Sequence, residues 1–531
     1  IQTEGCSISG FAMHGFKAIA IHISTGNNNL IRNNYIGTDY SANGLGDVTG
    51  VGVSVIGSGN VIGGTLPSER NIIAGCTGSG VDLNGTTSVG NRVEGNYIGT
   101  DRLGTLNLGN VFGVSVSYGT ANVIGGSVPG AGNLISGNSS GILILNGKVR
   151  VEGNLIGTDA AGTSPIGNQT GISISAFAAA NSDNVIGGAS AGARNVVSGN
   201  TGSGILVIGG MNRIKGNFIG TDLTGSTPLG NGGNGILHTP GFAGQTYNNV
   251  IGGLTLGEGN TIAYNALAGV SAFTSGSIVI RDSILGNSIH GNGGPGINFG
   301  GTPNDPQDAD TGVNRLQNFP TIISATIIGS DLQIQYSIDS APANANYDDG
   351  LGQAGLIAEF FKADSANQEG EVFLGRDRYT SADYSTGTLP GVKTVTLAGA
   401  GSLMSAASGV VASATDEDGN TSEFSVNVPV AASTPPGACG LTGLLSADGT
   451  TITYSFSGAL AGPFGSLAAG TPFKGWFSYA VAQADLSPGQ NRGDYKYNAI
   501  SLTFSPPSGN QTVTDSGTGV INIYDQQTTP Y

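Results

Sequence analysis

Apolar and polar residues alternate in short segments from residue 1 to about residue 300, and the same segments return along the chain. In the phrase NRVEGNYIGTD, which ends at Asp101, Val93 and Ile98 stay apolar and β-branched in every copy, whereas Glu94 is replaced only by other charged residues. Related phrases end at Asp39, Asp159 and Asp222. A period of two residues is typical of β-strands that bury one face. We therefore predict short strands with these apolar residues inside and the charged ones in solvent.

Two further phrases recur in step with the first one. NVIGG begins at Asn60, Asn122, Asn184 and Asn249, and an N-x-I-x-G-N phrase begins at Asn71, Asn133, Asn195 and, more loosely, Asn260. A common period of about 62 residues is the signature of stacked repeats rather than of one globular core. With three strand sets per period, one circuit takes about 21 residues. We predict a parallel β-solenoid of about 14 coils, roughly 65 to 70 Å long.

Repeated asparagines accompany the strands at the corners. One series comprises Asn34, Asn96, Asn154 and Asn217. A buried asparagine can hydrogen-bond backbone groups of adjacent coils, which keeps polar atoms paired where the chain turns. We therefore assign these residues to inward-facing turns with a stabilising role.

The composition changes after the repeats decay near residue 300. Residues 304–320 form a joint rich in proline and aspartate, and residues 321–430 hold six or seven alternating segments between turn signals, a pattern typical of an antiparallel Ig-like sandwich. Residues 431–438 form a proline-containing linker, and residues 439–531 again consist of strand-like segments. The sequence thus predicts an all-β chain, with a parallel β-helix at 1–303 followed by two antiparallel β-sandwich domains.

The repeated phrases resemble those of bacterial extracellular right-handed parallel β-helix proteins with NVIGG and GNYIGTD repeats. In that family the solenoid often runs into a QNFP segment and an Ig-like domain ending TDxxGNTSEFS, which correspond here to residues 317–320 and 415–425. Residues 439–531 resemble a small C-terminal β-domain of secreted bacterial proteins, through GTPFKGWFSY and GDYKYNAISLTF. The resemblance implies a right-handed solenoid and an extracellular or cell-surface location, and it implies no particular chemistry.

Composition narrows the range of partners. Glycine accounts for 93 of the 531 residues, only 10% of residues are charged, and the formal net charge is −16. A sparsely basic, acidic surface argues against a nucleic-acid partner and suits divalent cations or colloidal solubility. No apolar run reaches the roughly 18 residues of a transmembrane helix. Because the chain starts at Ile1 inside a repeat-like phrase, we expect either that a signal peptide and first coils were removed or that the numbering begins after them.

The three cysteines, Cys6, Cys76 and Cys439, are too few for a disulfide framework. Cys76 takes the place that Asn138 and Asn200 hold in the matching phrases, which predicts an inward turn position. Cys6 and Cys76 are expected more than three coils apart, roughly 15 Å, too far to bridge. We expect buried free thiols.

The repeated aspartates are the first candidates for catalysis, because solenoid enzymes need carboxylates that converge on a substrate. Copies of one phrase are expected three coils apart, roughly 14 Å, so these aspartates cannot share a substrate atom. Each one follows Gly-Thr and precedes a glycine turn, which favours an Asx-turn role. None of the four histidines lies in a metal or nucleophile motif. We therefore assign no catalytic residue.

Oxygen ligands gather at two places outside the repeats. In the joint, Asp305, Asp308, Asp310 and Asn314 lie close together, in the way that Ca²⁺ loops collect oxygen atoms. Before the last strand of the predicted sandwich, a second group comprises Asp416, Asp418 and Asn420. The alternative at the joint is a solvated, turn-rich linker, because the distal glutamate of an EF-hand is missing. Calcium is the one cofactor that the sequence suggests.

Two functions from different classes fit these observations. The first is a non-catalytic extracellular structural or adhesive protein, a rigid solenoid displayed on the cell surface or assembled head to tail into a filament. Its partners would be other copies of itself, through the 439–531 domain, and surface polysaccharide. The second is a polysaccharide-processing lyase or glycoside hydrolase with accessory carbohydrate-binding domains. Regular repeats favour the first, whereas three or more carboxylates and a basic residue on one face would favour the second.

Overall fold

The computed structural model divides the chain into two compact units, Ile1–Ala431 and Ala432–Tyr531. It describes residues 1–46, 50–175, 183–239, 246–273, 279–340, 355–365, 369–384, 390–405, 408–432, 442–445, 451–459, 472–480, 492–497, 499–504, 511–515 and 519–524. Within these ranges, side chains are described up to residue 431, apart from those of residues 246, 247 and 279.

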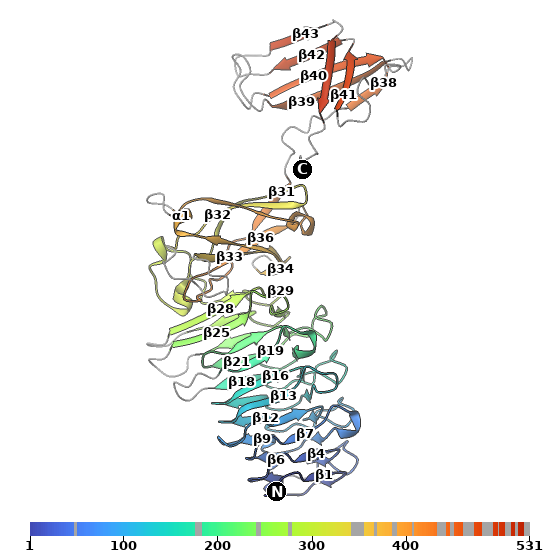
Figure 1. Ribbon diagram of the computed structural model, residues 1–531, viewed down its shortest axis with the longest axis vertical. Coiled ribbons are helices and arrows are strands. Elements are labelled where there is room, and N and C mark those ends of the chain that lie inside the picture. The colour runs from blue at the N-terminus through green and yellow to red at the C-terminus, as the bar shows by residue number, and fades with distance from the viewer. Residues whose placement is uncertain are drawn as a thin grey trace. The chain divides into compact units, whose positions relative to one another are not determined.

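The chain up to Asn298 forms a parallel β-solenoid of three sheets with ten strands in each (Figure 1). Sheet A contains β1 (Ser7–Ser9), β4 (Leu30–Arg32), β7 (Val61–Gly63), β10 (Arg92–Glu94), β13 (Thr120–Gly125), β16 (Lys148–Glu152), β19 (Val185–Gly187), β22 (Arg213–Lys215), β25 (Thr246–Gly252) and β28 (Val279–Leu285). Sheet B contains β2 (Ala12–Met13), β5 (Tyr35–Ile36), β8 (Ile72–Ile73), β11 (Tyr97–Ile98), β14 (Leu134–Ile135), β17 (Leu155–Ile156), β20 (Val196–Val197), β23 (Phe218–Ile219), β26 (Thr261–Ala263) and β29 (Ser288–His290). Sheet C contains β3 (Ile19–Ile23), β6 (Val51–Val55), β9 (Ser79–Asn84), β12 (Phe112–Ser117), β15 (Ser140–Leu145), β18 (Thr170–Ser175), β21 (Ile205–Ile208), β24 (Ile236–His238), β27 (Val270–Ala272) and β30 (Ile297–Asn298). The prediction of an all-β parallel solenoid is confirmed.

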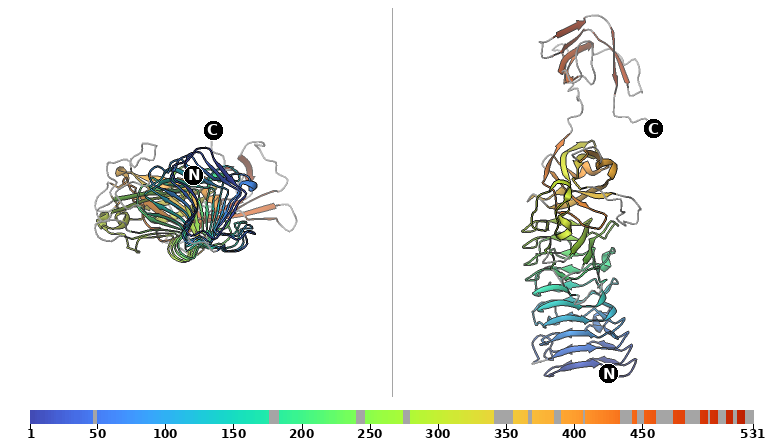
Figure 2. Two further views of the ribbon diagram at one scale, coloured as in Figure 1. Left: turned by 90° about the horizontal axis from the view of Figure 1, so that it is seen from below. Right: turned by 90° about the vertical axis from the view of Figure 1, so that its left-hand side faces the viewer.

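One circuit passes once through each sheet, and successive coils superpose in the end-on view of Figure 2. Strands β4 and β10 carry two copies of the repeated phrase and are separated in sheet A by a single strand, β7. The repeat of about 62 residues therefore spans two coils of about 31 residues each. The predictions of three circuits per repeat and of about 14 coils are wrong, because loops at the corners lengthen each circuit. Copies of one residue lie two coils apart, about 10 Å instead of 14 Å.

The repeated β-branched residues fill the interior as predicted. Val93, Ile98 and their counterparts Ile31, Ile36, Val151, Ile156, Ile214 and Ile219 have no exposed surface. The prediction that the charged residues are solvated is wrong for Glu94 and Glu152. Both glutamates are buried, and they form ion pairs with Arg92 and Arg150 respectively. The outer face of sheet A therefore carries shielded ion pairs at these positions rather than free charges.

Buried asparagines form a ladder at the corner between sheets A and B. The side-chain oxygen of Asn154 accepts hydrogen bonds from the backbone N–H and the side-chain amide of Asn133, at 3.0 and 2.9 Å, and Asn154 donates in turn to Asn195 at 3.0 Å. The ladder comprises Asn34, Asn71, Asn96, Asn133, Asn154, Asn195, Asn217, Asn260 and Asn287. The predicted stabilising role of the repeated asparagines is confirmed, since they pair buried polar atoms of adjacent coils.

The corner between sheets B and C follows the same rule. Its ladder comprises Cys76, Asn110, Asn138, Asn168, Asn200, Asn231, Asn265 and Asn292. Cys76 begins this ladder as a buried free thiol, as predicted, and burial raises the pKa of the thiol to about 12. Cys6 is also a free thiol but is only partly buried, and Cys439 lies outside the described residues.

Strands β31–β37 form one seven-stranded sheet after the solenoid. They are β31 (Thr321–Ile328), β32 (Asp331–Ser337), β33 (Leu356–Ala363), β34 (Gly370–Tyr379), β35 (Lys393–Leu397), β36 (Gly409–Thr415) and β37 (Val428–Ala432), in the spatial order β34, β33, β36, β37, β31, β32, β35. Strand β33, next to the edge strand β34, pairs antiparallel with both β34 and β36. Tyr336, Phe360 and Tyr379 are buried together in the core of this sheet. The Ig-like sandwich arrangement stays a prediction.

Acidic side chains of this sheet cap the last coil of the solenoid. Asn292 ends the ladder between sheets B and C, and it donates its backbone N–H and its side-chain amide to the two carboxylate oxygens of Glu369, at 2.9 and 3.0 Å. The backbone N–H of Gly286 donates to Glu359 at 2.8 Å. These carboxylates take the acceptor positions that a further coil would otherwise supply.

The end of the predicted joint belongs to the same cap. Val313 is buried in the solenoid core, and Asn314 accepts from the backbone N–H of Asp282 at 2.7 Å while donating to the carbonyl of Thr421 at 2.9 Å. The joint contains two short 3₁₀ segments, η3 (Pro306–Asp308) and η4 (Val313–Leu316). Residues 313–316 are therefore packed between the solenoid and the seven-stranded sheet rather than forming a free linker.

Helical structure is scarce in the described parts of the chain. It comprises α1 (Ser381–Tyr384) and, besides the joint, η1 (Pro67–Glu69), η2 (Ala191–Ala193) and η5 (Ala400–Leu403). No helix within the described ranges has the length and apolar character needed to cross a membrane.

The second unit is also built of strands. A five-stranded sheet contains β38 (Thr442–Leu445), β39 (Thr451–Ala459), β40 (Pro472–Ala480), β42 (Ala499–Phe504) and β43 (Gln511–Asp515), and a two-stranded sheet contains β41 (Arg492–Tyr497) and β44 (Gly519–Tyr524). Both sheets are antiparallel along their paired strands. The β-sandwich predicted for residues 439–531 stays a prediction.

The carboxylates of the cap make its stability depend on pH. Burial raises the pKa of Glu359 and of Glu369 to about 7, and the nearby carboxylate of Asp364 contributes to the rise at Glu369. Between about pH 4.5 and pH 7 the folded chain therefore holds protons that the unfolded chain has released, so the free energy of unfolding falls as the pH rises through this window.

We expect the unfolding temperature to be higher at about pH 5 than at about pH 8. Glu369→Gln keeps an acceptor for Asn292 and mimics the protonated acid, so it should raise the unfolding temperature at the higher pH and flatten the profile. The control Glu4→Gln changes an exposed carboxylate and should leave the profile unaltered. A wild-type unfolding temperature that rises with pH across this range would contradict the assignment.

Candidate functional site

The outer face of sheet B forms the floor of a groove along the solenoid. In strands such as β11 the second residue is buried in the core and the first faces outward, and Tyr97 is in register with Ile72 and Leu134 on the neighbouring strands. The outward row comprises Tyr35, Ile72, Tyr97, Leu134, Leu155, Val196 and Phe218. The floor is therefore apolar or aromatic over seven successive strands. Its accessible surface comes from Tyr35, Tyr97, Leu155 and Phe218, because Ile72, Leu134 and Val196 are only 1 to 3% exposed.

One wall of the groove consists of loops at the corner between sheets B and C, which we call the first ridge. It comprises residues 38–46, 100–108, 158–166 and 221–229. The repeated aspartates shape these loops: Asp101 accepts from the backbone N–H groups of Thr105 and Leu106 at 2.7 and 2.8 Å. Equivalent bonds are made by Asp39, Asp159 and Asp222. The predicted turn-forming role of the repeated aspartates is confirmed.

The loops of the first ridge stack on one another to give a continuous wall. The backbone N–H of Ala160 donates to the carbonyl of Gly104 at 3.0 Å, and that of Leu223 donates to the carbonyl of Gly162 at 3.1 Å. Because only every second coil carries such a loop, these bonds connect loops across an intervening coil. The wall therefore repeats about every 10 Å along the solenoid.

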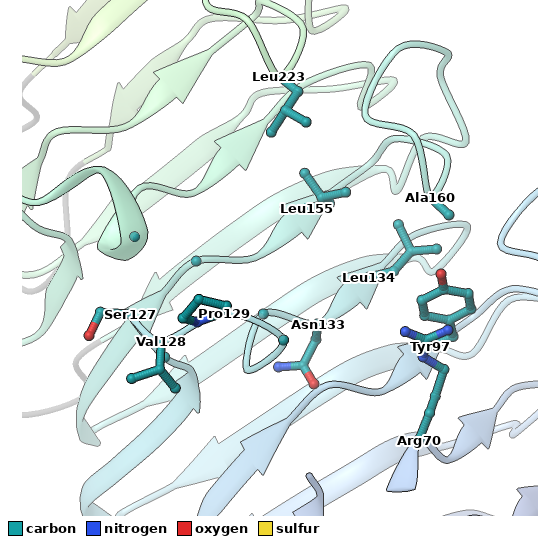
Figure 3. Close-up of a pocket in the computed structure, with 15 residues that line it drawn as sticks. Arg70, Tyr97, Ser127, Val128, Pro129, Asn133, Leu134, Leu155, Ala160 and Leu223 are labelled. Carbon is teal, nitrogen blue, oxygen red and sulfur yellow. The ribbon is translucent and has the colours of Figure 1, made fainter. Parts of the chain in front are cut away.

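The opposite wall, which we call the second ridge, lies at the corner between sheets A and B. It comprises residues 64–70, 126–132, 188–194 and 253–259. Between the two ridges lies a hollow of about 380 Å³, with Leu134 and Leu155 on its floor and Val128 and Pro129 on the second ridge (Figure 3). The lining residues are Arg70, Tyr97, Gly126, Ser127, Val128, Pro129, Gly130, Gly132, Asn133, Leu134, Gly153, Leu155, Ala160, Gly192 and Leu223. None of them is acidic, and none is a histidine.

Two arginines of the second ridge lie on aromatic residues of the floor. Arg70 lies against Tyr97 (Figure 3), with its guanidinium 3.9 Å from the centre of the ring, and the guanidinium of Arg194 is 4.1 Å from the centre of the Phe218 ring. Each Nε also donates to a backbone carbonyl, at 3.2 and 3.0 Å respectively. Among the residues that the structure describes, neither guanidinium forms an ion pair, in contrast to Arg32, Arg92, Arg150 and Arg213.

The arginine and the aromatic residue vary together between repeats. Arg70 and Arg194 each contact the aromatic residue of the floor strand one coil further on. The second-ridge loop that ends at Gly132 lacks the arginine, and the floor strand one coil further, β17, carries Leu155 instead of an aromatic residue. The hollow lies at this repeat. Sequence reasoning missed both arginines, although the alternation of arginine and glycine before the asparagine of the N-x-I-x-G-N phrase was a signal that could have identified them.

Large apolar side chains project from both ridges. Those more than half exposed are Tyr40, Leu45, Leu66, Leu103, Leu106, Val128, Leu223 and Leu256. Exposed apolar side chains that gather in this way are typical of interaction surfaces rather than of the remaining surface of a monomer. The groove and its two ridges, which we call the flank groove, are therefore the leading candidate for a binding site.

The joint brings three of the predicted calcium ligands together. Asp305, Asp308 and Asp310 each offer a carboxylate oxygen, and these oxygens lie within 4.8 Å of one another. Asp308 accepts from the backbone N–H of Asn318 at 2.9 Å and from the hydroxyl of Ser340 at 2.7 Å. Burial raises the pKa of Asp308 to about 6, and the charges of the other two aspartates contribute to the rise.

The remaining predicted ligands are engaged in protein contacts. Asp418 pairs with Arg315 at 2.6 Å, and Asp416 accepts from the side-chain amide of Asn420 at 2.6 Å. Asn314 is buried in the cap, where it bonds Asp282 of the solenoid and Thr421, which lies in the connection between β36 and β37. The arginine at the second group competes with a cation for these carboxylates. Calcium stays a prediction for both groups, and the joint is the better candidate.

The comparisons with known proteins give no family assignment. No protein-family model matches the chain, and no curated protein matches it. One similar solved structure is the enzymatically active domain of bacteriophage CBA120 tailspike protein 2, with 12% identity over 92% of this chain and 72% of that chain, at a TM-score of 0.24. Another is full-length tailspike protein 2 from an Escherichia coli O157:H7 bacteriophage, with 11% identity over 94% and 59%, at a TM-score of 0.19. TM-scores this low support no conclusion about activity.

Calcium at the joint can be tested by thermal unfolding. An ion bound to three mutually repelling carboxylates should stabilise the fold, so about 1 mM Ca²⁺ should raise the unfolding temperature of the metal-free chain. Asp308→Asn should remove this response, whereas Asp418→Asn should keep it if the joint is the site. An unfolding temperature of the wild type that is the same with and without calcium would contradict the prediction.

Proposed function

We propose that the chain is a non-catalytic extracellular structural or adhesive protein, in which the solenoid is a rigid scaffold and the flank groove is the contact surface for a linear surface polymer. The observation that carries the proposal is the lining of the hollow, which combines apolar side chains, backbone groups, one arginine and the polar side chains of Tyr97, Ser127 and Asn133 without any acidic residue or histidine. Such a lining can hold a polymer but offers no carboxylate or imidazole for acid–base or nucleophilic catalysis, and the ring of Tyr97 is covered by the guanidinium of Arg70.

The repeated aspartates also support a non-catalytic role. The reason is their hydrogen bonds and not the distance between them. At about 10 Å apart they approach the roughly 6.5 to 9.5 Å that separates the two carboxyl groups of an inverting glycosidase. Their oxygens, however, accept backbone N–H groups of their own loops, as Asp101 does from Thr105 and Leu106. A carboxylate used in this way holds a turn and is not directed at a substrate.

An extracellular location belongs to this proposal because the repeats resemble those of extracellular bacterial proteins. Self-association through residues 439–531 remains a separate prediction. The enzyme alternative would be favoured by three or more carboxylates and a basic residue converging on one face, and the lining of the hollow supplies no carboxylate.

The proposal predicts binding without turnover. Purified chain should co-sediment with a linear surface polysaccharide and should release neither reducing ends nor unsaturated products from it. Leu155→Asp places a charge on the groove floor and should weaken binding at least about tenfold, because the buried carboxylate would need solvation that the bound polymer removes.

The matched control is Leu143→Asp, which makes the same change at a partly buried, outward-facing position of sheet C. It should bind as the wild type does. Depolymerisation of any polymer in the panel, or equal loss of binding in both variants, would contradict the proposed function.

A further inference from the structure

The two arginines of the flank groove are prepared to bind anions. Arg70 and Arg194 are each fixed on an aromatic ring, at 3.9 and 4.1 Å, and tied through Nε to a backbone carbonyl. No carboxylate among the described residues pairs with either guanidinium. Glu69, which is next to Arg70 in the sequence, forms an ion pair with Arg32 at 2.8 Å instead. A guanidinium that is already oriented loses less conformational entropy when it forms a bidentate contact with a carboxylate.

The two arginines are spaced along the axis of the solenoid. They precede β8 and β20, which are separated in sheet B by β11, β14 and β17, so four strand spacings of about 4.8 Å place them roughly 19 Å apart. The hollow lies between them, with Leu134 and Leu155 on its floor. A ligand that reaches both arginines must therefore be extended and must place an apolar face over Leu155, since Leu134 is buried.

A polypeptide is a poor match for this groove. Each strand of sheet B that forms the floor pairs on both edges with the strands of adjacent coils, as β11 does with β8 and β14. No free strand edge faces the groove, so a peptide could not bind by adding a strand. A polysaccharide does not need such an edge, because its sugar rings present apolar faces and its substituents present hydrogen-bonding groups.

We propose that the flank groove binds a linear polysaccharide bearing carboxylate groups, with Arg70 and Arg194 as the two anion contacts and the hollow between them as the site for the intervening sugar rings. This inference rests on the proposed function, which names the groove as a contact surface, and it adds the chemical class of the polymer and the residues that select it. The negative net charge of the chain opposes an anionic ligand at long range, but this repulsion is screened beyond about 8 Å at physiological ionic strength.

The proposal can be tested by titration calorimetry at about 0.15 M salt with the full chain. The probes are polygalacturonate, alginate, a carboxyl-reduced polygalacturonate and poly-glutamate. At least one of the two uronate polymers should bind. The carboxyl-reduced polygalacturonate, which lacks the charge, and poly-glutamate, which lacks the sugar rings, should each bind at least about tenfold more weakly than that uronate, since charge-assisted contacts and ring packing are both required.

The variants assign the contacts to residues. Arg70→Ala and Arg194→Ala should each weaken binding of the polymer about tenfold, and the double variant should weaken it further. Arg213→Ala is the matched control, because Arg213 is an exposed arginine of β22 in sheet A and lies outside the flank groove. The circular dichroism and unfolding temperatures of the variants should equal those of the wild type, which excludes loss of the fold as the cause.

The outcomes separate this inference from the proposed function. If neither uronate binds, if the carboxyl-reduced polymer binds equally well, or if poly-glutamate matches the uronates, the inference is wrong. Binding of a neutral polymer that is lost in Leu155→Asp but kept in both arginine variants would preserve the proposed function and refute the inference. Cleavage of a uronate that still depends on both arginines would preserve the inference and refute the non-catalytic role.

Discussion

The hydrogen bond between buried asparagines of successive coils is the interaction on which this structure depends. A chain that turns three corners per circuit buries backbone N–H and carbonyl groups at each corner. An asparagine at the corner solves this problem because its amide donates and accepts at once. Asn154, for example, accepts from Asn133 and donates to Asn195, and its amide also reaches the carbonyl of Ile124.

The same requirement explains the cap and the groove. A ladder that simply stopped would leave the last asparagine with buried donors and no acceptor, and Glu369 supplies that acceptor from another part of the chain. Because the ladders fix every coil against the next, loops that occur once in two coils are stacked into straight ridges. The flank groove is therefore held open by the solenoid itself, which is the preorganisation that binding an extended polymer requires.

Much of the solenoid could be predicted from the sequence, because strand alternation and corner asparagines are local properties. The inward positions of Val93 and Ile98 and the turn role of Asp101 followed directly from the repeated phrase. The number of coils could not be predicted, since long corner loops and extra strands have similar lengths in the sequence. The shielding of Glu94 by Arg92 was missed because it depends on side chains that share one strand of the outer face.

The candidate site was harder to predict because it is assembled from different coils. Arg70 and Tyr97 are separated by most of a coil in the sequence, and only the register of sheet B places them together. The joint aspartates were found because they are neighbours in the sequence. Glu359 and Glu369 were missed entirely, since nothing in the sequence of the seven-stranded sheet indicates that it ends a solenoid.

The measurement that tests the central claim most directly is the free energy of unfolding of Asn154→Ala against that of Asn84→Ala. Removing the side chain of the buried Asn154 leaves its hydrogen-bond partners in the adjacent coils, Asn133 and Asn195, without that contact. We therefore predict that the free energy of unfolding falls by about 3 kcal/mol or more. Asn84 is exposed at the end of β9, and its replacement should cost less than about 0.5 kcal/mol. Equal and small losses in the two variants would show that the asparagine ladders do not hold the solenoid together.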